Sequence, residues 1–354
     1  MKPLVSIIIV NYNGYGLLTS CLDSIFLNNY SNYEIIIADN GSTDNSVSKI
    51  RNKYSKSRHK LKVLNLKKNY GPSLARNLAF KKSKGEIIAF LDNDTLVKKD
   101  WISQVVPIFK SNKKIGVIQS KLLLLEQPNK IDYVGELLGN LGFLKSTAQY
   151  GEIDNGQYDS SNSILAAKSA GMFIRRQAFI DAGEFDPDYF IFIEESDLGW
   201  RTWLAGYKNI FCPKSIVYHK FSSTKDIVDP KFNNYLVRFH GTKNYIQTLI
   251  KNLSFWYLLK ILPVHLILWF CLATYLFLTG KFLSAKNIYK GIFWNISHLR
   301  QTLRKRKLVQ EKRKVSDQKL FVTYKLMSKT NLHYYINKFT NSQKVIITPE
   351  NNQK

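Results

Sequence analysis

The first hundred residues alternate short apolar runs with segments in which apolar residues recur at helical spacing. The apolar runs, each long enough for a strand, lie at residues 5–10, 34–38, 61–66 and 86–91. The intervening segments predict helices at 17–27, from about Thr43 and at 72–83. Strands that are apolar throughout are buried on both faces, so this alternation predicts an α/β fold with a parallel sheet between layers of helices. Ligands of such sheets bind beyond the carboxyl ends of the strands.

Two of these strands end in polar clusters. Residues 39–44 (DNGSTD) follow the second strand, either as an Asx-rich turn or as acceptors for a ribose or base. Asp92-Asn93-Asp94 follows the fourth strand. A D-x-D triplet is common by chance, but two carboxylates at a strand end suit Mg²⁺ or Mn²⁺ bound to a diphosphate.

Residues 100–230 are less regular. A short strand and a helix are predicted within 169–185, a helix over 193–207, and a strand over 209–219 that ends in His219. Alone, a histidine at a strand end is more often a satisfied polar residue; beside a D-x-D triplet it is a candidate nitrogen ligand or phosphate donor.

The helix at 193–207 begins with three carboxylates, Glu194, Glu195 and Asp197. Negative charge is favourable at a helix N-terminus, which is one explanation for the cluster. The other is a general base that takes the proton from an attacking hydroxyl.

Beyond residue 230 the chain changes character. Residues 261–280 contain no charged side chain, and twenty helical residues cover about 30 Å, the thickness of a bilayer core. A buried helix of a soluble domain is the alternative. The following segment, 298–314, is strongly basic, so a single crossing would conflict with the positive-inside tendency. A re-entrant or interfacial segment, with the basic residues on anionic headgroups, avoids the conflict and is favoured.

The pattern therefore divides the chain into three regions. We expect an α/β domain at 1–230, with a first half at about 1–100 and a second half at about 101–230. A membrane-associated helical region at 231–320 follows, with membrane contact over about 253–314. A polar tail is expected at 321–354.

Composition narrows the class of protein. The 354 residues are 45% hydrophobic, as in a folded enzyme, and carry a net charge of +26. That charge suggests nucleic acid, anionic lipid or phosphorylated ligands, and a compositional bias toward Lys, Asn and Ile is the alternative explanation. The basic residues show no RNA-binding signature, so nucleic acid is not expected as a partner. Three scattered cysteines and the absence of a visible signal peptide fit a reducing, cytosolic face.

Six segments in order resemble the family 2 inverting glycosyltransferases of the GT-A fold, most closely the rhamnosyltransferase-like branch. They span about residues 4–225 and read VSIIIVNYNG, IIIADNGSTDNS, GPSLARNLAF, FLDNDT, AGMFIRRQAFIDAGEFDPDYFIFIEESDLGWR and AGYKNIFCPKSIVYH. The resemblance implies a mostly parallel nucleotide-binding sheet flanked by helices. It implies that residues 1–230 form the catalytic domain, with a nucleotide-sugar half at about 1–100 and an acceptor half at about 101–230. It also implies transfer of a sugar, hexosyl or rhamnosyl, from a nucleotide-diphosphate sugar to an acceptor hydroxyl with inversion, using Mg²⁺ or Mn²⁺.

The resemblance also implies a role for each candidate residue. The expected metal ligands are Asp94, Asp92 and His219, with Asp92 near the ribose or the metal. The expected nucleotide-sugar-binding residues are Asn11, Asp39, Asp44, Arg76, Asn77 and Asp92. Glu195 is the expected base; Glu stands where the family usually has Asp, so Glu194 and Asp197 remain alternatives.

Two other functions account for only part of the sequence. A processive polysaccharide synthase usually carries a QxxRW motif and several membrane spans; GWRTW is not that motif, which favours single additions. A non-catalytic membrane-bound scaffold gives no reason for carboxylates at three strand or helix ends. The expected acceptor is a lipid-linked glycan on the cytoplasmic side of the cell membrane, in cell-surface polysaccharide or glycoconjugate synthesis. The sequence does not identify the sugar, the nucleotide, the linkage or the oligomeric state.

Overall fold

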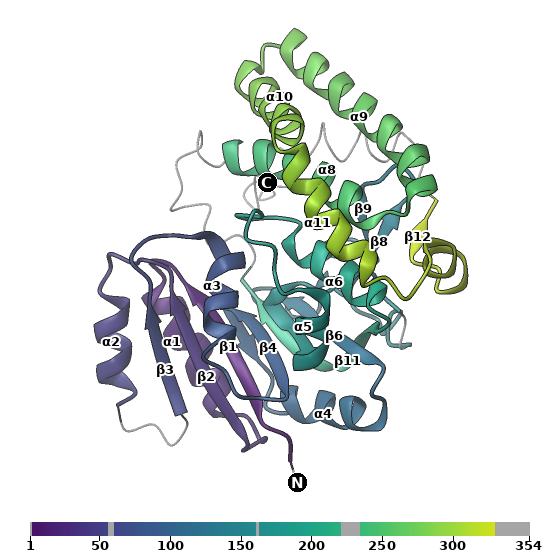
Figure 1. Ribbon diagram of the computed structural model, residues 1–354. Helices are drawn as coiled ribbons and strands as arrows, with labels where there is room; N and C mark the ends of the chain where they lie inside the picture. Colours follow the sequence, from purple (N-terminus) through teal and green to yellow (C-terminus); the bar gives the residue numbers. More distant parts are fainter. Residues whose placement is uncertain (1, 56–59, 161–162, 221–233, 330–354) are drawn as a thin grey trace, which may run out of the picture.

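A central sheet organises the molecule. The structure, a computed structural model, describes residues 2–55, 60–160, 163–220 and 234–329 (Figure 1). The strand order is β3-β2-β1-β4-β10-β6-β11-β5, and β7 also pairs with β6. The first four strands are parallel, as the sequence predicts, and are bounded by Val5–Asn11 (β1), Tyr33–Asp39 (β2), Lys60–Asn65 (β3) and Ile87–Asp92 (β4).

The second half of the sheet mixes strand directions. Strand β10 runs antiparallel to both β4 and β6, β11 runs parallel to β6, and β5 runs antiparallel to β11. This pairing sets His219 level with Thr95, directly after the acidic turn that ends β4. The bounds are Thr95–Val97 (β5), Ile115–Leu124 (β6), Ile131–Tyr133 (β7), Met172–Arg175 (β10) and Lys208–His219 (β11).

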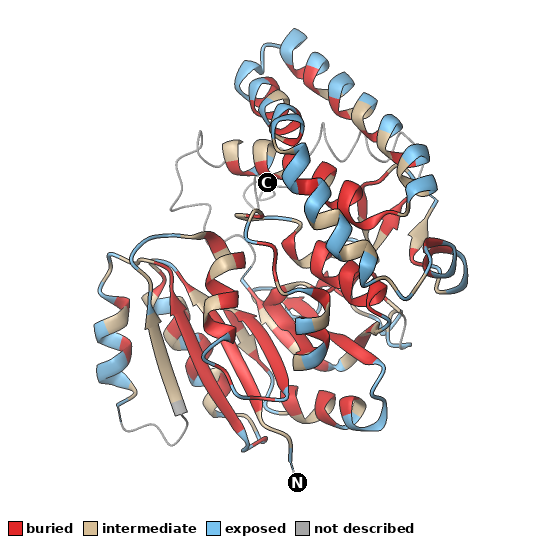
Figure 2. Cartoon of the chain, in the orientation of Figure 1, coloured by how far each residue is buried: buried red, intermediate tan, exposed pale blue. Residues whose placement is uncertain are grey.

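Both faces of the sheet are buried, because neighbouring residues of each strand enter different cores. Ile7 and Ile9 pack with helices α1, α2 and α4, while Ile8 packs with α3, α5 and α6. Figure 2 shows the strands as an almost continuously buried layer. The helices are Tyr15–Phe26 (α1), Ser46–Lys53 (α2), Gly71–Phe80 (α3), Trp101–Ser111 (α4), Arg176–Ala182 (α5) and Glu194–Leu204 (α6).

Strand β6 lies in the stretch whose pattern is irregular. Its middle residues, Gln119, Ser120 and Lys121, are polar yet buried. Trp101 Nε1 donates to Ser120 Oγ at 3.0 Å, and Lys121 Nζ lies 2.8 Å from a carboxylate oxygen of Asp154. The strand remains buried because these polar groups are paired, which the local sequence does not reveal.

The C-terminal helices gather at the end of the molecule far from the N-terminus (Figure 1). After the π-helix η3 (Leu236–His240), the chain forms Gly241–Asn252 (α8), Phe255–Leu278 (α9), Phe282–Ser297 (α10) and Leu299–Glu311 (α11).

The chain then returns to the β-strands at residues 136–146. Its last described strand, β12 (Met327–Ser328), pairs with β8 (Glu136–Gly139), which pairs with β9 (Leu144–Ser146). The π-helix η4 (Lys319–Thr323) precedes it, and Phe321 and Leu326 are buried. Residues 330–354 of the expected polar tail lie outside the described residues.

Helix α9 contains the apolar stretch expected at the membrane. Within the described chain it alone is long and apolar enough to cross a bilayer, and 28% of its most apolar 18-residue stretch is buried. A core helix of a soluble protein meets the same criteria of length and composition, but it is mostly buried. In α9 a single stripe is buried, and the outer side is exposed along most of its length (Figure 2). The stripe consists of Ile261, His265, Trp269, Ala273 and Leu276.

Candidate active site

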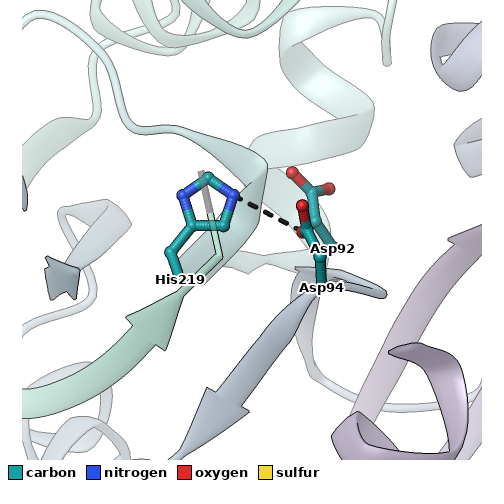
Figure 3. Close-up of side chains that lie close together, drawn as sticks. All are labelled: Asp92, Asp94 and His219. Atoms are coloured by element: carbon teal, nitrogen blue, oxygen red, sulfur yellow. Dashed lines mark ion pairs between the residues drawn. The ribbon is translucent and has the colours of Figure 1, made fainter. Parts of the chain in front are cut away.

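Asp92, Asp94 and His219 lie together at the carboxyl end of the sheet (Figure 3). One oxygen or nitrogen atom from each lies within 4.8 Å of the other two, and His219 Nε2 is 3.4 Å from Asp94 Oδ1. Strand β4 ends at Asp92 and β5 begins at Thr95, so Asp94 occupies the tight turn between them. The pairing of β11 with β5 supplies His219 from more than a hundred residues away.

This donor set fits a divalent cation. Carboxylate oxygens are the preferred ligands of Mg²⁺ and Mn²⁺, and Mn²⁺ also accepts imidazole nitrogen. Ligand atoms at about 2.1 Å from an octahedral ion lie about 3.0 Å apart at right angles, close to the observed spacing of His219 and Asp94. Among the described residues, no other group of three such side chains has this spacing.

Asp132, on β7, orients the histidine. Its Oδ2 lies 2.8 Å from His219 Nδ1, which leaves Nε2 directed at Asp94. A carboxylate behind a histidine ligand fixes its ring orientation and its tautomer. Burial acts to lower the pKa of His219, but the hydrogen bonds to Asp132 and Asp94 outweigh it and raise the pKa to about 10. A histidine ligand binds a cation in its neutral form, so cation binding would displace this proton.

Arg76, from α3, links the acidic turn to helix α6. Its guanidinium is buried and lies 3.0 Å from Asp92 Oδ1 and 3.1 Å from Glu194 Oε1. A buried arginine requires such partners, because an unpaired charge in the interior is costly. Arg76, one of the residues predicted to bind the nucleotide sugar, therefore joins the acidic turn after β4 to the first turn of α6.

Glu195 is partly exposed and held at one oxygen. Its Oε1 accepts a 2.7 Å hydrogen bond from the Ser169 backbone N–H and another from the Ser169 hydroxyl. Arg76 Nη2 lies 3.9 Å from the same oxygen. The Ser169 hydroxyl oxygen also lies 3.2 Å from Asp92 Oδ1, so a single hydroxyl touches the acidic turn and α6.

Glu194 and Asp197 are more deeply buried than Glu195. Burial and the charge of Glu195 raise the pKa of Glu194 to about 8, although Arg76 opposes the shift. Asp197 accepts hydrogen bonds from Arg201 Nε at 2.8 Å and Lys251 Nζ at 3.0 Å. Asn252 Nδ2 donates to its second oxygen at 3.0 Å, so both oxygens of Asp197 hold α6 against α8.

Asn11 and Asp39 form a buried polar pair at the ends of β1 and β2. Asn11 Nδ2 donates to Asp39 Oδ2 at 3.0 Å, and the Ser42 backbone N–H donates to Asp39 Oδ1 at 2.9 Å. Asp39 lies at the predicted strand end and its carboxylate is engaged by the following turn. Asp44 lies later in the same turn and accepts from the Tyr15 backbone N–H at 3.2 Å.

Asn77 contacts the loop before α6. Its Nδ2 donates to the Phe185 carbonyl at 2.7 Å and its Oδ1 accepts from the Phe185 N–H at 3.1 Å. Both ends of the amide are thus paired with backbone. Gly71, at the start of the same helix, has φ of +77°, and a Cβ there would lie 2.4 Å from the Phe190 carbonyl oxygen. Helix α3 and the 185–193 loop are therefore packed closely.

The loop enters α6 through two residues in the left-handed region. Phe192 has φ of 68° and Ile193 has φ of 66°, directly before Glu194. A β-branched residue rarely adopts this conformation, which costs roughly 1–3 kcal/mol per residue. Backbone strain of this kind concentrates at functional sites, where the surrounding contacts maintain it.

Sequence reasoning missed Asp132 and Ser169. Ser169 opens the predicted SAG segment, but a serine before a short strand carries no signal of its own. Asp132 lies in a three-residue strand whose pairing with β6 shifts in register. Neither residue belongs to a pattern that the sequence displays.

Comparison with family models decides the class of protein. The model described as "Glycosyl transferase family 2" matches residues 6–136, and the model described as "Glycosyl transferase family group 2" matches residues 87–286, more than half of the chain. The chain is a family 2 glycosyltransferase. The acidic turn, Arg76 and the start of α6 all lie within these matched ranges.

Two relatives of this glycosyltransferase are about a quarter identical to it over the residues that align. The Escherichia coli protein WfgD, described as a UDP-Glc:alpha-D-GlcNAc-diphosphoundecaprenol beta-1,3-glucosyltransferase, is 27% identical over 72% of this chain and 96% of its own length. An uncharacterized Sinorhizobium fredii protein, y4gI, is 26% identical over 63% of this chain. The match spans only 25% of y4gI, and 58% and 57% of two other relatives, so it covers less than two thirds of these proteins.

Solved structures show the same GT-A fold. The mannosyltransferase PcManGT from Pyrobaculum calidifontis, solved with GDP-Man and Mn²⁺, aligns with a TM-score of 0.53 at 15% identity. The alignment covers 88% of this glycosyltransferase and 86% of that chain. The expected α/β, GT-A-type fold is thus confirmed.

Proposed function

We propose that this glycosyltransferase transfers a sugar from a nucleotide-diphosphate sugar to an acceptor hydroxyl, with inversion at the anomeric carbon. The proposal rests on one observation: Arg76 and Ser169 each contact carboxylates of two acidic groups and so hold these groups next to each other. One group, Asp92 and Asp94 with His219, suits a metal-bound diphosphate; the other, Glu194 and Glu195, suits proton removal. PcManGT, which shares the fold, is described with a nucleotide sugar and Mn²⁺.

A divalent cation bound by Asp92, Asp94 and His219 would supply the positive charge that a departing diphosphate requires. Glu195 takes the proton from the acceptor hydroxyl, which then attacks the face of the sugar opposite the diphosphate. Its Oε1 is held by Ser169, which leaves Oε2 to accept the proton. Direct displacement needs no covalent enzyme intermediate, and inversion follows from it.

The geometry ranks the three candidate bases. Glu195 is 22% exposed at its side chain, whereas Glu194 is 5% exposed and Asp197 is fully buried. Asp197 is also paired through both oxygens with side chains of α6 and α8. We therefore propose Glu195 as the base, Glu194 as the partner of Arg76, and Asp197 as a structural residue.

The nucleotide is proposed to bind beside Asp39, Asn11 and Asp44 at the ends of β1 and β2. There the internal pairing of Asp39 with Asn11 and Ser42 holds the carboxylate in one orientation before a ligand arrives. The proposed boundaries remain a catalytic domain at 1–230 followed by the membrane-associated region. The acceptor is proposed to be a lipid-linked glycan in cell-surface glycan synthesis, as the described activity of WfgD suggests.

A panel of nucleotide sugars tests the proposal. With Mn²⁺ present, one class of UDP, GDP or dTDP sugar at about 100 times its Kd is expected to raise the Tm by roughly 5 °C, and to be hydrolysed slowly without acceptor. Rhamnosyl and hexosyl donors are included side by side. The proposal is rejected if no nucleotide sugar is stabilising or turned over with either Mn²⁺ or Mg²⁺.

Membrane association is proposed through the outer side of α9 and the basic residues near it. Trp256, Phe270 and Phe277 are 77%, 43% and 55% exposed. The sequence contains no acidic residue between Asp229 and Glu311, so its positive charge favours anionic headgroups. Because one stripe of α9 packs on the protein, we propose that the helix lies in the cytoplasmic interface.

Replacing Trp256, Phe270 and Phe277 by Ser is expected to weaken binding to vesicles containing phosphatidylglycerol by at least about tenfold. Each large apolar side chain contributes roughly 1.5–3 kcal/mol on leaving water, and about 1.4 kcal/mol corresponds to a tenfold change in affinity. Vesicle sedimentation gives the measurement. The matched control replaces Leu27, Ile153 and Ile180, which are also exposed but lie outside the C-terminal helices. Equal pelleting of the two triple variants would refute the proposed membrane face.

A further inference from the structure

The backbone that carries Glu194 and Glu195 is held from the C-terminal region. The carbonyl of Phe192, the first of the two left-handed residues before Glu194, accepts a hydrogen bond from a side chain of α8. A strained segment of this kind keeps its shape only where its surroundings determine it. The side chain that does so here lies about fifty residues later in the sequence.

Asn244 of α8 makes the decisive contact. It is fully buried, and its Nδ2 donates to the Ile191 carbonyl at 2.9 Å and to the Phe192 carbonyl at 2.7 Å. A primary amide has two N–H donors, and both are used by two consecutive carbonyls. The peptide planes on either side of Phe192 are therefore fixed by one side chain. We propose that Asn244 is a positioning residue for the base-carrying helix α6, an inference that rests on the proposed function.

Further contacts hold the earlier part of this loop. Tyr189 Oη lies 2.7 Å from Thr248 Oγ1 of α8, and the Tyr189 carbonyl accepts a 2.5 Å hydrogen bond from Ser73 of α3. Lys305 of α11 lies 2.5 Å from Asp188 Oδ2. The loop is thus held between α3 and the C-terminal helices, and Asn244 provides the contact nearest to Glu194.

The consequence for catalysis follows from where the carboxylates are attached. The Ile193 carbonyl accepts the Asp197 N–H at 2.8 Å and so begins α6, while Glu195 reaches Ser169 from the first turn of that helix. If the loop relaxes, Glu195 shifts while the acidic turn of β4 stays, because the turn belongs to the sheet. A misplacement of about 1 Å costs roughly 100-fold in rate. The expected effect is therefore on kcat and not on the KM of the donor.

The test compares Asn244→Ala with Asn295→Ala. Asn295 is a matched control, since it is also buried and its Nδ2 donates to two carbonyls, those of Lys243 at 3.1 Å and Gly291 at 2.9 Å. The first bond joins α10 to α8, the second lies within α10, and neither carbonyl belongs to the loop. Asn244→Ala is expected to lower kcat about 100-fold with the donor KM within about twofold of wild type. Asn295→Ala is expected to lose Tm to a similar extent and to keep kcat within about threefold.

Two further variants separate hydrogen bonding from packing. Asn244→Asp keeps the size of the side chain but removes both N–H donors, so its kcat is expected to fall at least as far as that of Asn244→Ala. Asn244→Ser, a milder change that keeps one donor, is expected to fall between Asn244→Ala and wild type. If Asn244→Asp and Asn244→Ala resemble Asn295→Ala in kcat, the inference is wrong.

Amide hydrogen exchange distinguishes failure of this inference from failure of the proposed function. Exchange at residues 190–196 is expected to accelerate in Asn244→Ala and not in Asn295→Ala, whether or not the protein transfers sugar. An inactive wild-type protein with this exchange pattern would reject the proposed function and retain the role of Asn244 in shaping the loop. Equal exchange in the two variants would reject that role.

Discussion

Asp94→Ala is expected to abolish sugar transfer, with a loss of kcat of about 10³-fold or more. Asp94 lies in the turn between β4 and β5, 3.4 Å from His219 Nε2. Alanine at this position has no oxygen that could replace the lost carboxylate ligand. Charge stabilisation by a bound metal is worth several kcal/mol, and each lost 1.4 kcal/mol, approximately, lowers the rate tenfold. Initial rates with saturating donor and Mn²⁺ provide the measurement.

Chelation and a second aspartate variant serve as controls. Excess EDTA is expected to remove wild-type activity, and added Mn²⁺ or Mg²⁺ is expected to restore it. Asp23→Ala removes an exposed carboxylate paired with Lys53 on the surface and should leave turnover unchanged. Full activity of the wild type in chelator, or of Asp94→Ala with metal, would exclude a metal role for this residue.

Glu195→Gln is expected to lower kcat by about 10²- to 10⁴-fold while donor binding is retained. The amide oxygen of Gln can still accept from the Ser169 N–H and hydroxyl, so the geometry of α6 is kept and only the capacity to take a proton is lost. Transfer to acceptor is measured by product formation, and donor binding by the shift in Tm with nucleotide sugar.

Variants of the neighbouring carboxylates test the assignment. Asp197→Asn is expected to lower Tm more than kcat, because Asp197 pairs with Arg201 and Lys251 in the interior. Glu194→Gln is expected to disturb Arg76 and to reduce donor affinity as well as rate. Normal turnover by Glu195→Gln together with an inactive Glu194→Gln would transfer the role of base to Glu194.

The acidic turn could be predicted because its signal is local. Strand β4 is apolar up to Leu91, and the carboxylates come directly after it, so their place at the carboxyl edge of the sheet followed from the sequence. The same holds for the strand that ends in His219. That His219 meets Asp94 depends on the antiparallel pairing of β11 with the three-residue strand β5, which the rule for parallel sheets does not predict.

The rest of the site depends on contacts between distant segments. An irregular pairing of β7 with β6 brings Asp132 to His219. Strand β6 itself is hard to recognise in the sequence, because its middle residues Gln119, Ser120 and Lys121 are polar although they are buried. Ser169 becomes significant only where it touches Asp92 and Glu195. No periodicity in the chain records such contacts, because each is set by the packing of whole elements.

The basic segment at 298–314 differs in part from the prediction that its charged residues lie on anionic lipid headgroups. Lys305 pairs with Asp186 and Asp188, and the Arg306 guanidinium donates to the Ile250 carbonyl at 2.5 Å. These side chains point into the protein, so only part of the positive charge in this segment is available to a membrane. A helical pattern of charges does not reveal which side of the helix is covered.

The return of the chain from α11 to strand β12 bears on how this enzyme can be handled in the laboratory. Asp317 accepts a hydrogen bond from the Ser254 N–H at 2.6 Å, and β12 pairs with β8. The residues that follow the apolar helix are therefore part of the same folded unit as the residues that precede it. A shortened gene that stops before α9 would remove these contacts together with Lys305. To prepare the protein without detergent, it is therefore better to keep the chain intact and to replace exposed apolar residues on the outer side of α9 by polar ones.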